Sequence, residues 1–104
     1  MKKVKITVMK KVSHPELIER YENPIENHCD MQTGQVFVAN GWEKPEGLCQ
    51  SAWDSMSAFV MALSFGAQDL YEGWMKNPRS AMISCNDGFR PVSFLLETME
   101  EDAE

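Results

Sequence analysis

Three cysteines, at positions 29, 49 and 85, are the side chains of this sequence with the clearest potential for chemistry. Cys49 directly precedes a segment with a helical pattern. A thiol near a helix N-terminus has its thiolate favoured by the helix dipole and by free backbone N–H groups. The opposing interpretation is that the cysteines are buried and pack as small apolar groups, as free cysteines often do. Both interpretations stay open at this point.

The spacing of the cysteines does not match the local patterns of metal sites. The sequence has no C-x-x-C pair of the zinc or redox kind and no local iron–sulfur run. The three thiols could still converge in space on zinc or iron, so the cofactor is open. His28 could add a nitrogen, although its adjacency to Cys29 makes joint ligation of one ion awkward. No HExxH, GxSxG, P-loop or GxGxxG motif is present, and the sequence does not decide whether the protein is an enzyme.

The stretch ISCNDGFRPVSF, residues 83–94, predicts a hairpin that presents a thiol. Asn, Asp and Gly tolerate positive φ, so they favour a turn between Cys85 and Arg90. Strand alternation puts Ile83 and Cys85 on one face. We therefore expect Cys85 to point inward, towards Cys49, with Arg90 near enough to favour a thiolate or to hold an anion. The alternative is that Asp87 bonds within the turn and Arg90 is a solvated strand end.

The three tryptophans are candidates for either a ligand pocket or the core. Trp42 and Trp74 lie in loops, where a large ring can line a pocket or cover a small core. Trp53 lies beside the apolar stripe of the long helix, so we expect it in the core.

The pattern of apolar residues predicts a single small α+β domain over residues 1–99, with elements in the order β-α-β-α-β-β. We expect an antiparallel or mixed sheet of about four strands, with two helices mainly on one face. Strands are expected over 3–9, 35–40, 81–85 and 90–97, and helices over 13–23 and 51–66. Ser51 and Asp54 resemble a capping box at the start of the second helix. The predicted core consists of in-facing apolar residues: Val4, Ile6, Val8, Val36, Val38, Phe59, Val60, Leu63, Val92, Phe94 and Leu96.

Composition and charge narrow the class of protein. The chain has 104 residues, of which 43% are apolar, and a formal net charge of −6. An acidic chain without interleaved basic and aromatic residues does not predict nucleic-acid binding. No apolar run is long enough for a membrane span, and the start lacks the apolar segment of a signal peptide, so we expect a cytoplasmic protein with reduced cysteines. Residues 100–104 are expected to form a disordered acidic tail.

The motifs GW-KPEG-C--AW over residues 41–53, VMAL-FG over 60–66 and C-DG-RPV-F-LE over 85–97 resemble a family of small prokaryotic proteins. That family is defined by sequence and has no functional name. The resemblance covers nearly the whole chain. It implies that the positions of Cys29, Cys49 and Cys85 are typically cysteine, and that a further cysteine often stands where this chain has Ser84. It also includes the positions of Trp53, Asp87, Gly88, Arg90 and Pro91. The resemblance favours a shared thiol site and implies no substrate or reaction.

Three functional hypotheses follow. The first is a small cytoplasmic thiol or metal-binding protein, related to redox chemistry, that uses Cys29, Cys49 and Cys85. The second is a non-catalytic binding or self-associating module, a possible homo-oligomer, with structural cysteines. The third is a small enzyme with Cys49 or Cys85 as nucleophile, His28 as base and Arg90 holding an anion.

Overall fold

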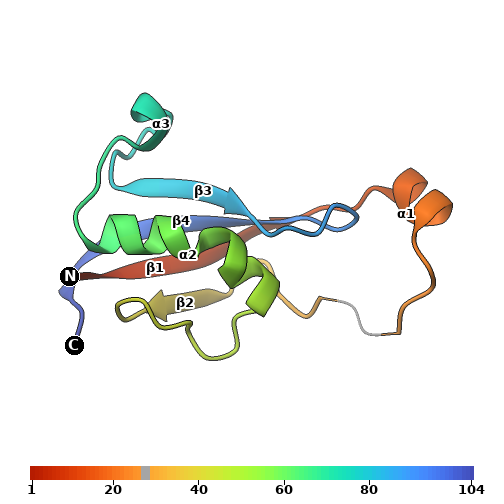
Figure 1. The fold of residues 1–104 in the computed structure, drawn as a ribbon, viewed down its shortest axis with the longest axis horizontal. Helices are drawn as coiled ribbons and strands as arrows, with labels where there is room; N and C mark the ends of the chain where they lie inside the picture. Colours follow the sequence, from red (N-terminus) through yellow and green to blue (C-terminus); the bar gives the residue numbers. More distant parts are fainter. Residues whose placement is uncertain (27–28) are drawn as a thin grey trace.

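The computed structural model describes residues 1–26 and 29–104 and contains a four-stranded antiparallel sheet in the order β2-β1-β4-β3 (Figure 1). The long central strands β1 and β4 pair with each other, and each carries a shorter strand on its outer edge. The predicted α+β class and the order of elements are confirmed, and the sheet is antiparallel throughout. The strands are β1 (Lys2–Lys11), β2 (Val36–Ala39), β3 (Ser80–Ser84) and β4 (Val92–Asp102).

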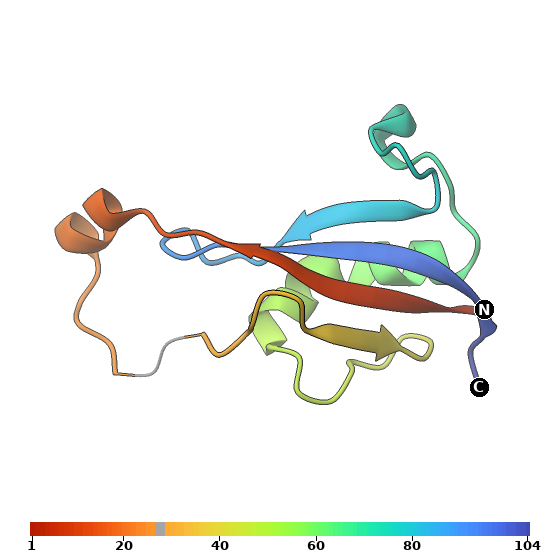
Figure 2. The ribbon, with the colours of Figure 1, turned by 180° about the vertical axis from the view of Figure 1, so that it is seen from behind.

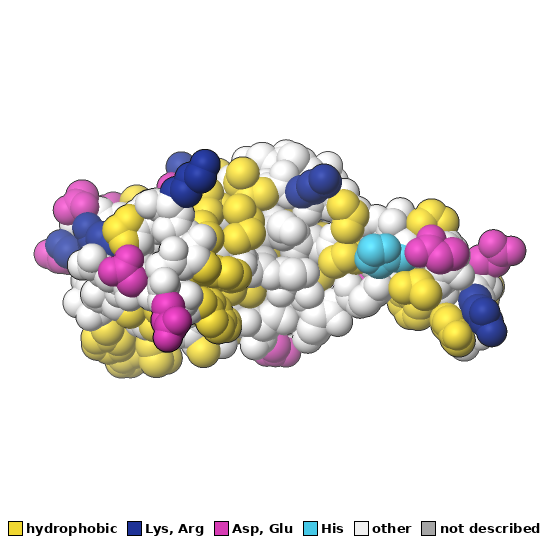
Figure 3. All heavy atoms as spheres, turned by 90° about the horizontal axis from the view of Figure 1, so that it is seen from above, with side chains coloured by type: hydrophobic (Ala, Val, Ile, Leu, Met, Phe, Trp, Pro, Cys, Tyr) yellow, Lys and Arg dark blue, Asp and Glu magenta, His cyan; other side chains and the backbone are white. Residues whose placement is uncertain are grey.

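The helix α2 (Gln50–Ser64) covers one face of this sheet and packs against β1, β3 and β4. The opposite face is crossed by no helix of the described residues (Figure 2). The helix α1 (Pro15–Tyr21) buries none of its residues and lies beyond the end of the sheet. The molecule measures 44 × 30 × 20 Å, broad at the end that carries α3 (Leu70–Gly73) and narrow towards α1 (Figure 3).

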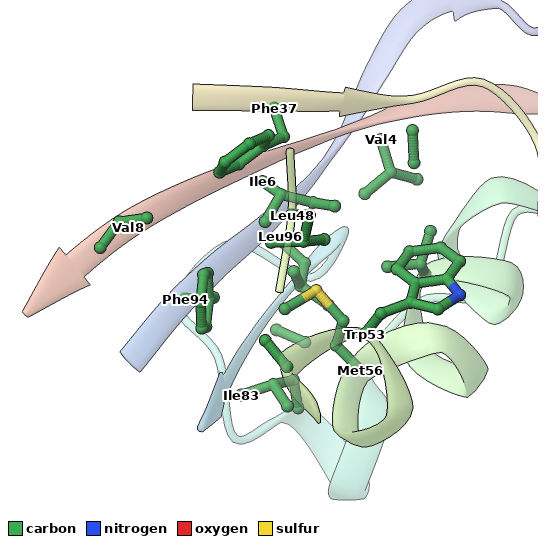
Figure 4. Close-up of a cluster of buried hydrophobic side chains, with 14 of the residues drawn as sticks. Val4, Ile6, Val8, Phe37, Leu48, Trp53, Met56, Ile83, Phe94 and Leu96 are labelled. Atoms are coloured by element: carbon green, nitrogen blue, oxygen red, sulfur yellow. The ribbon is translucent and has the colours of Figure 1, made fainter. Parts of the chain in front are cut away.

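The core lies between α2 and the sheet (Figure 4). In β1, apolar and polar residues alternate, and Val4, Ile6 and Val8 are at most 1% exposed. Phe94 and Leu96 of β4 are fully buried beside them, because alternate residues of a strand point to the same face. The alternation in β1 and β4 therefore identified the in-facing residues of the central strands correctly.

The predicted in-facing residues of β2 were wrong. Val36 and Val38 are 49% and 42% exposed, whereas Phe37 and Ala39 are buried at 8% and 1%. The segment QVFVAN has apolar residues at successive positions, so its pattern does not select a face. Pairing with β1, in which Phe37 lies opposite Ile6, makes that choice. Phe59 is also only partly buried, at the margin of the core.

The acidic C-terminal residues were expected to form a disordered tail, but up to residue 102 they belong to a strand. The strand β4 continues to Asp102, which lies opposite Lys2 of β1. Lys2 and Asp102 form an ion pair at 2.8 Å, and Lys3 pairs with Glu101 at 2.9 Å. Residues 100–104 were expected to fray because they have little to bury. Instead they continue the pairing with β1, and their charges meet its lysines.

Candidate functional site

A small pocket of about 40 Å³ lies where the start of α2 meets the turn between β3 and β4. We call it the thiol pocket, because all three cysteines line it. They come from three segments far apart in the sequence: the loop before β2, the residue before α2, and the end of β3. The full lining is Cys29, Met31, Cys49, Ser51, Ala52, Cys85, Asp87, Arg90, Val92 and Phe94.

Cys49 is the N-cap residue of α2. Its carbonyl oxygen accepts the first helical hydrogen bond, from the backbone N–H of Trp53 at 3.0 Å. Its Sγ lies 3.2 Å from the Oγ of Ser51. The predicted capping box was wrong, because Ser51 lies inside the helix and its hydroxyl contacts a thiol instead of capping the backbone. The helix begins two residues earlier than the Ser-x-x-Asp pattern indicated, at Gln50.

The pKa of the Cys49 thiol is lowered from its ordinary value. The hydroxyl of Ser51 is the largest cause, followed by the backbone N–H of Ala52. Partial burial and the negative charge of Asp30 oppose the shift without cancelling it. These are the donors expected at the start of a helix, and they favour the thiolate, which is the nucleophilic form of cysteine.

Cys85 is half-buried and packs against the core beyond the end of β3. Two hydrogen bonds fix it to β4. Its own N–H donates to the carbonyl oxygen of Val92 at 3.0 Å, and the N–H of Val92 donates to Cys85 Sγ at 3.3 Å. A sulfur that accepts a backbone N–H is held in one orientation. The structure thus brings Cys85 and Cys49 to one pocket, and Cys85 packs against the core as strand alternation indicated.

Cys29 is exposed and forms part of the lining of the thiol pocket. The Nζ of Lys11 donates to its backbone carbonyl at 3.4 Å. Cys29 and Arg90 also line a wider surface depression of about 380 Å³, which includes Ser13. His28, its predicted companion, lies outside the described residues.

Asp87 and Arg90 both make structural contacts. Asp87 Oδ1 accepts hydrogen bonds from the backbone N–H groups of Phe89 and Arg90, at 2.8 and 3.1 Å, so it closes the turn as the alternative interpretation had it. The Arg90 guanidinium forms a two-contact ion pair with Glu22, at 2.8 and 3.0 Å. The Glu22 carboxylate raises the pKa of Arg90. Arg90 therefore joins the residue after α1 to the hairpin. It also lines the thiol pocket, as predicted, but it is not among the causes of the lowered pKa of Cys49.

The tryptophans lie in three different parts of the fold. Trp53 is 9% exposed and belongs to the core, as expected. Trp42 is 61% exposed, beside the chain termini. Trp74 is 48% exposed and contacts Tyr71 edge-on, with ring centroids 4.8 Å apart. Figure 3 shows hydrophobic side chains gathered at this α3 end of the molecule. The lining of the thiol pocket, over the described residues, contains no tryptophan.

Two residues of the site were missed in the sequence. Ser51 was interpreted as a helix cap, although its position two residues after Cys49 at the start of a helix is a usable signal for a thiol partner. Met31 forms part of the pocket wall and is 2% exposed, from a loop whose pattern carried no indication of burial.

Over residues 1–26 and 29–104, no three His, Cys, Asp or Glu side chains are arranged to hold a metal ion. None of the helices in the described part of the chain combines the length and the apolar character needed to cross a membrane. Comparison with protein-family models, with curated proteins and with solved structures finds no match to this chain. The resemblance to a family of small prokaryotic proteins therefore stays a prediction.

Proposed function

We propose that this protein is a small redox-active thiol protein, in which Cys49 is the reactive thiolate and Cys85 is the second thiol of the pair. The observation that carries the proposal is the convergence of cysteines from separate segments on one small pocket at the start of α2. Three unpaired cysteines are expected in a reducing compartment, so the proposal includes a cytoplasmic location.

Cys49 is the better nucleophile of the pair. The hydroxyl of Ser51 and the backbone N–H of Ala52 lower its pKa, and its side chain is only partly buried. A thiol that is both accessible and enriched in thiolate is the kind that reacts in exchange and oxidation. Cys85 lines the same pocket, and the Val92 N–H that donates to its sulfur holds its side chain in one orientation.

The reaction that fits this pair is exchange with a small disulfide, written R–S–S–R. The Cys49 thiolate attacks one sulfur of the disulfide, forms a mixed disulfide with it and releases R–S⁻. Cys85 then loses its proton to solvent and attacks the Cys49 sulfur, which releases the second R–S⁻. In total the two protein thiols are oxidised to one disulfide and the small disulfide is reduced to two thiols.

The other hypotheses have less support. Zinc or iron binding would need a cluster of ligands that the described residues do not form. A cysteine-dependent enzyme would need a base and an anion site, but Arg90 is paired with Glu22 and His28 is outside the described residues. A small pocket between a helix and a sheet edge accommodates exchange at an accessible sulfur better than it accommodates a bulky substrate.

The proposal is tested by the pH dependence of Cys49 alkylation with iodoacetamide, followed by peptide mass spectrometry. Ser51→Ala removes the largest cause of the lowered pKa, so its alkylation profile should move to higher pH. Ser51→Thr keeps a hydroxyl and should stay close to the unmodified protein. If Cys49 is alkylated with the pH dependence of an ordinary cysteine in all three proteins, its proposed role as the reactive thiolate is refuted.

Oxidised glutathione tests the pair. The unmodified protein should end with a Cys49–Cys85 disulfide and two equivalents of glutathione released. Cys85→Ser should stop at glutathione bound to Cys49. The Cys29→Ser variant serves as the control and should behave like the unmodified protein. A disulfide that forms between Cys49 and Cys29 instead, or no modification of Cys49, would contradict the proposed pair.

A further inference from the structure

The sheet face opposite α2 carries a row of side chains that runs straight across all four strands. Val36 of β2 lies opposite Thr7 of β1, Thr7 opposite Leu95 of β4, and Leu95 opposite Met82 of β3. We call these four residues the apolar row. Side chains directly opposite one another on adjoining strands are about 5 Å apart, so the row is continuous.

The apolar row is open to solvent. Val36 is 49% exposed and Met82 is 38% exposed, at the two edges of the sheet. Leu95 is partly exposed at its centre. Figure 2 looks towards this face and shows the central strands in front of α2. Three of the four residues are apolar, and exposed apolar side chains grouped on one sheet face favour contact with another surface.

A second row lies beside the first and carries opposite charges at its centre. Val38 of β2 lies opposite Lys5 of β1, Lys5 opposite Glu97 of β4, and Glu97 opposite Ser80 of β3. We call it the charged row. Its lysine and its glutamate stand on the two central strands, one on each side of the middle of the sheet.

We propose that two copies of this chain pack by these faces, around a two-fold axis that runs parallel to the strands between β1 and β4. Such an axis places β1 of one copy over β4 of the other. Lys5 then faces the second copy's Glu97, and Thr7 faces the second copy's Leu95. Sheets pack face to face about 10 Å apart with strands nearly aligned, so these central pairs are within side-chain reach.

The charges select this axis over the alternative that runs across the strands. An axis across the strands through the charged row would place each Lys5 on the second copy's Lys5 and each Glu97 on its counterpart. Like charges facing one another across an interface oppose association. Only the axis parallel to the strands pairs both charges and also stacks the apolar row on itself, with Val36 over the second copy's Met82.

The test is an exchange of charges between two variants, measured by sedimentation equilibrium. The unmodified chain should dimerise. Lys5→Glu puts two carboxylates in each facing pair, and Glu97→Lys puts two ammonium groups there, so each variant alone should show a dimer Kd raised by about tenfold or more. An equimolar mixture of the two variants should regain the dimer, because position 5 of either variant then faces an opposite charge at position 97 of the other.

The mixture separates the interface from the fold. Each variant has like charges opposite one another within its own sheet, and mixing does not change that, so a regained dimer reports contact between copies. A mixture as monomeric as its components would overturn the proposal. So would an unmodified chain that stays monomeric at about 1 mM, where an interface of only about −4 kcal/mol would already be half populated.

A pair of matched variants tests the apolar row. Met82→Lys places a charge in the row and should raise the dimer Kd by about tenfold or more. Met61→Lys, on the outer side of α2, changes a methionine of similar exposure, 41% against 38%, and should leave the Kd unchanged. Equal effects of the two substitutions, or no effect of Met82→Lys, would overturn the proposed face.

Discussion

Replacing Phe94 by alanine is expected to remove much of the stability of the fold. Phe94 is 0% exposed and is the largest of the fully buried side chains. It lies on a central strand, opposite Val8 of β1 on one side and Ile83 of β3 on the other. It also forms part of the wall of the thiol pocket.

The size of the effect follows from this complete burial. A fully buried phenylalanine cut back to alanine costs about 3–5 kcal/mol, from lost transfer free energy and the cavity left behind. In a domain of about this size, each 1 kcal/mol lowers the Tm by about 4–8 °C. The expected fall in Tm is therefore about 12–40 °C, against a total free energy of unfolding of about 5–15 kcal/mol for a typical domain.

The assay is thermal and urea unfolding followed by circular dichroism. Phe65→Ala is the matched control, since Phe65 at the end of α2 is 63% exposed and its loss should change the free energy of unfolding by no more than about 0.5 kcal/mol. Phe59→Ala should fall between the two, because Phe59 is partly buried. A loss below about 1 kcal/mol for Phe94→Ala would refute the packing described for β4.

Two further predictions follow from the strands. Phe37→Ala should destabilise the protein far more than Val38→Ala in urea titrations, because Phe37 is 8% exposed and Val38 is 42% exposed. The reverse order would mean that Val38, and not Phe37, faces the core. The hydrogen bond and ion pair with Lys2 lower the pKa of Asp102, so the unfolded chain binds this proton more readily than the folded one. The stabilisation from Asp102 should be complete above its ordinary pKa of about 3.9 and be lost as the pH falls towards the lower folded value. Unfolding measured between pH 7 and pH 3 should show a shallower acid-side loss in Asp102→Asn, and an unchanged slope would contradict this assignment.

The fold class could be predicted because β1 alternates cleanly and because β4 has apolar residues at every second position from Val92 to Leu96. In Lys3–Val8 the apolar residues recur at every second position, and one face must be buried for such a strand to be stable. β2 lacked this information, since Val36, Phe37 and Val38 are consecutive apolar residues. Its register with β1 decided which of them turned inward.

The candidate site was predicted in part for the same reason. Local pattern placed Cys49 next to a helix start and Cys85 at the end of a strand, and both are where expected. The partner of Arg90 was not predictable. Glu22 is 68 residues away in the sequence, and no local signal links the two.

The sequence by itself determined the order of the elements, the faces of the strands with alternating residues and the presence of three cysteines. These depend on local periodicity and composition, which a single chain displays directly. The tertiary structure alone decided which residues share a pocket and which carboxylate pairs with Arg90. It also decided that the acidic C-terminal residues extend β4, and that the described helices leave one sheet face uncovered. Each of these depends on contacts between residues distant in sequence, whose formation is governed by pairing register and by the packing of α2 on the sheet.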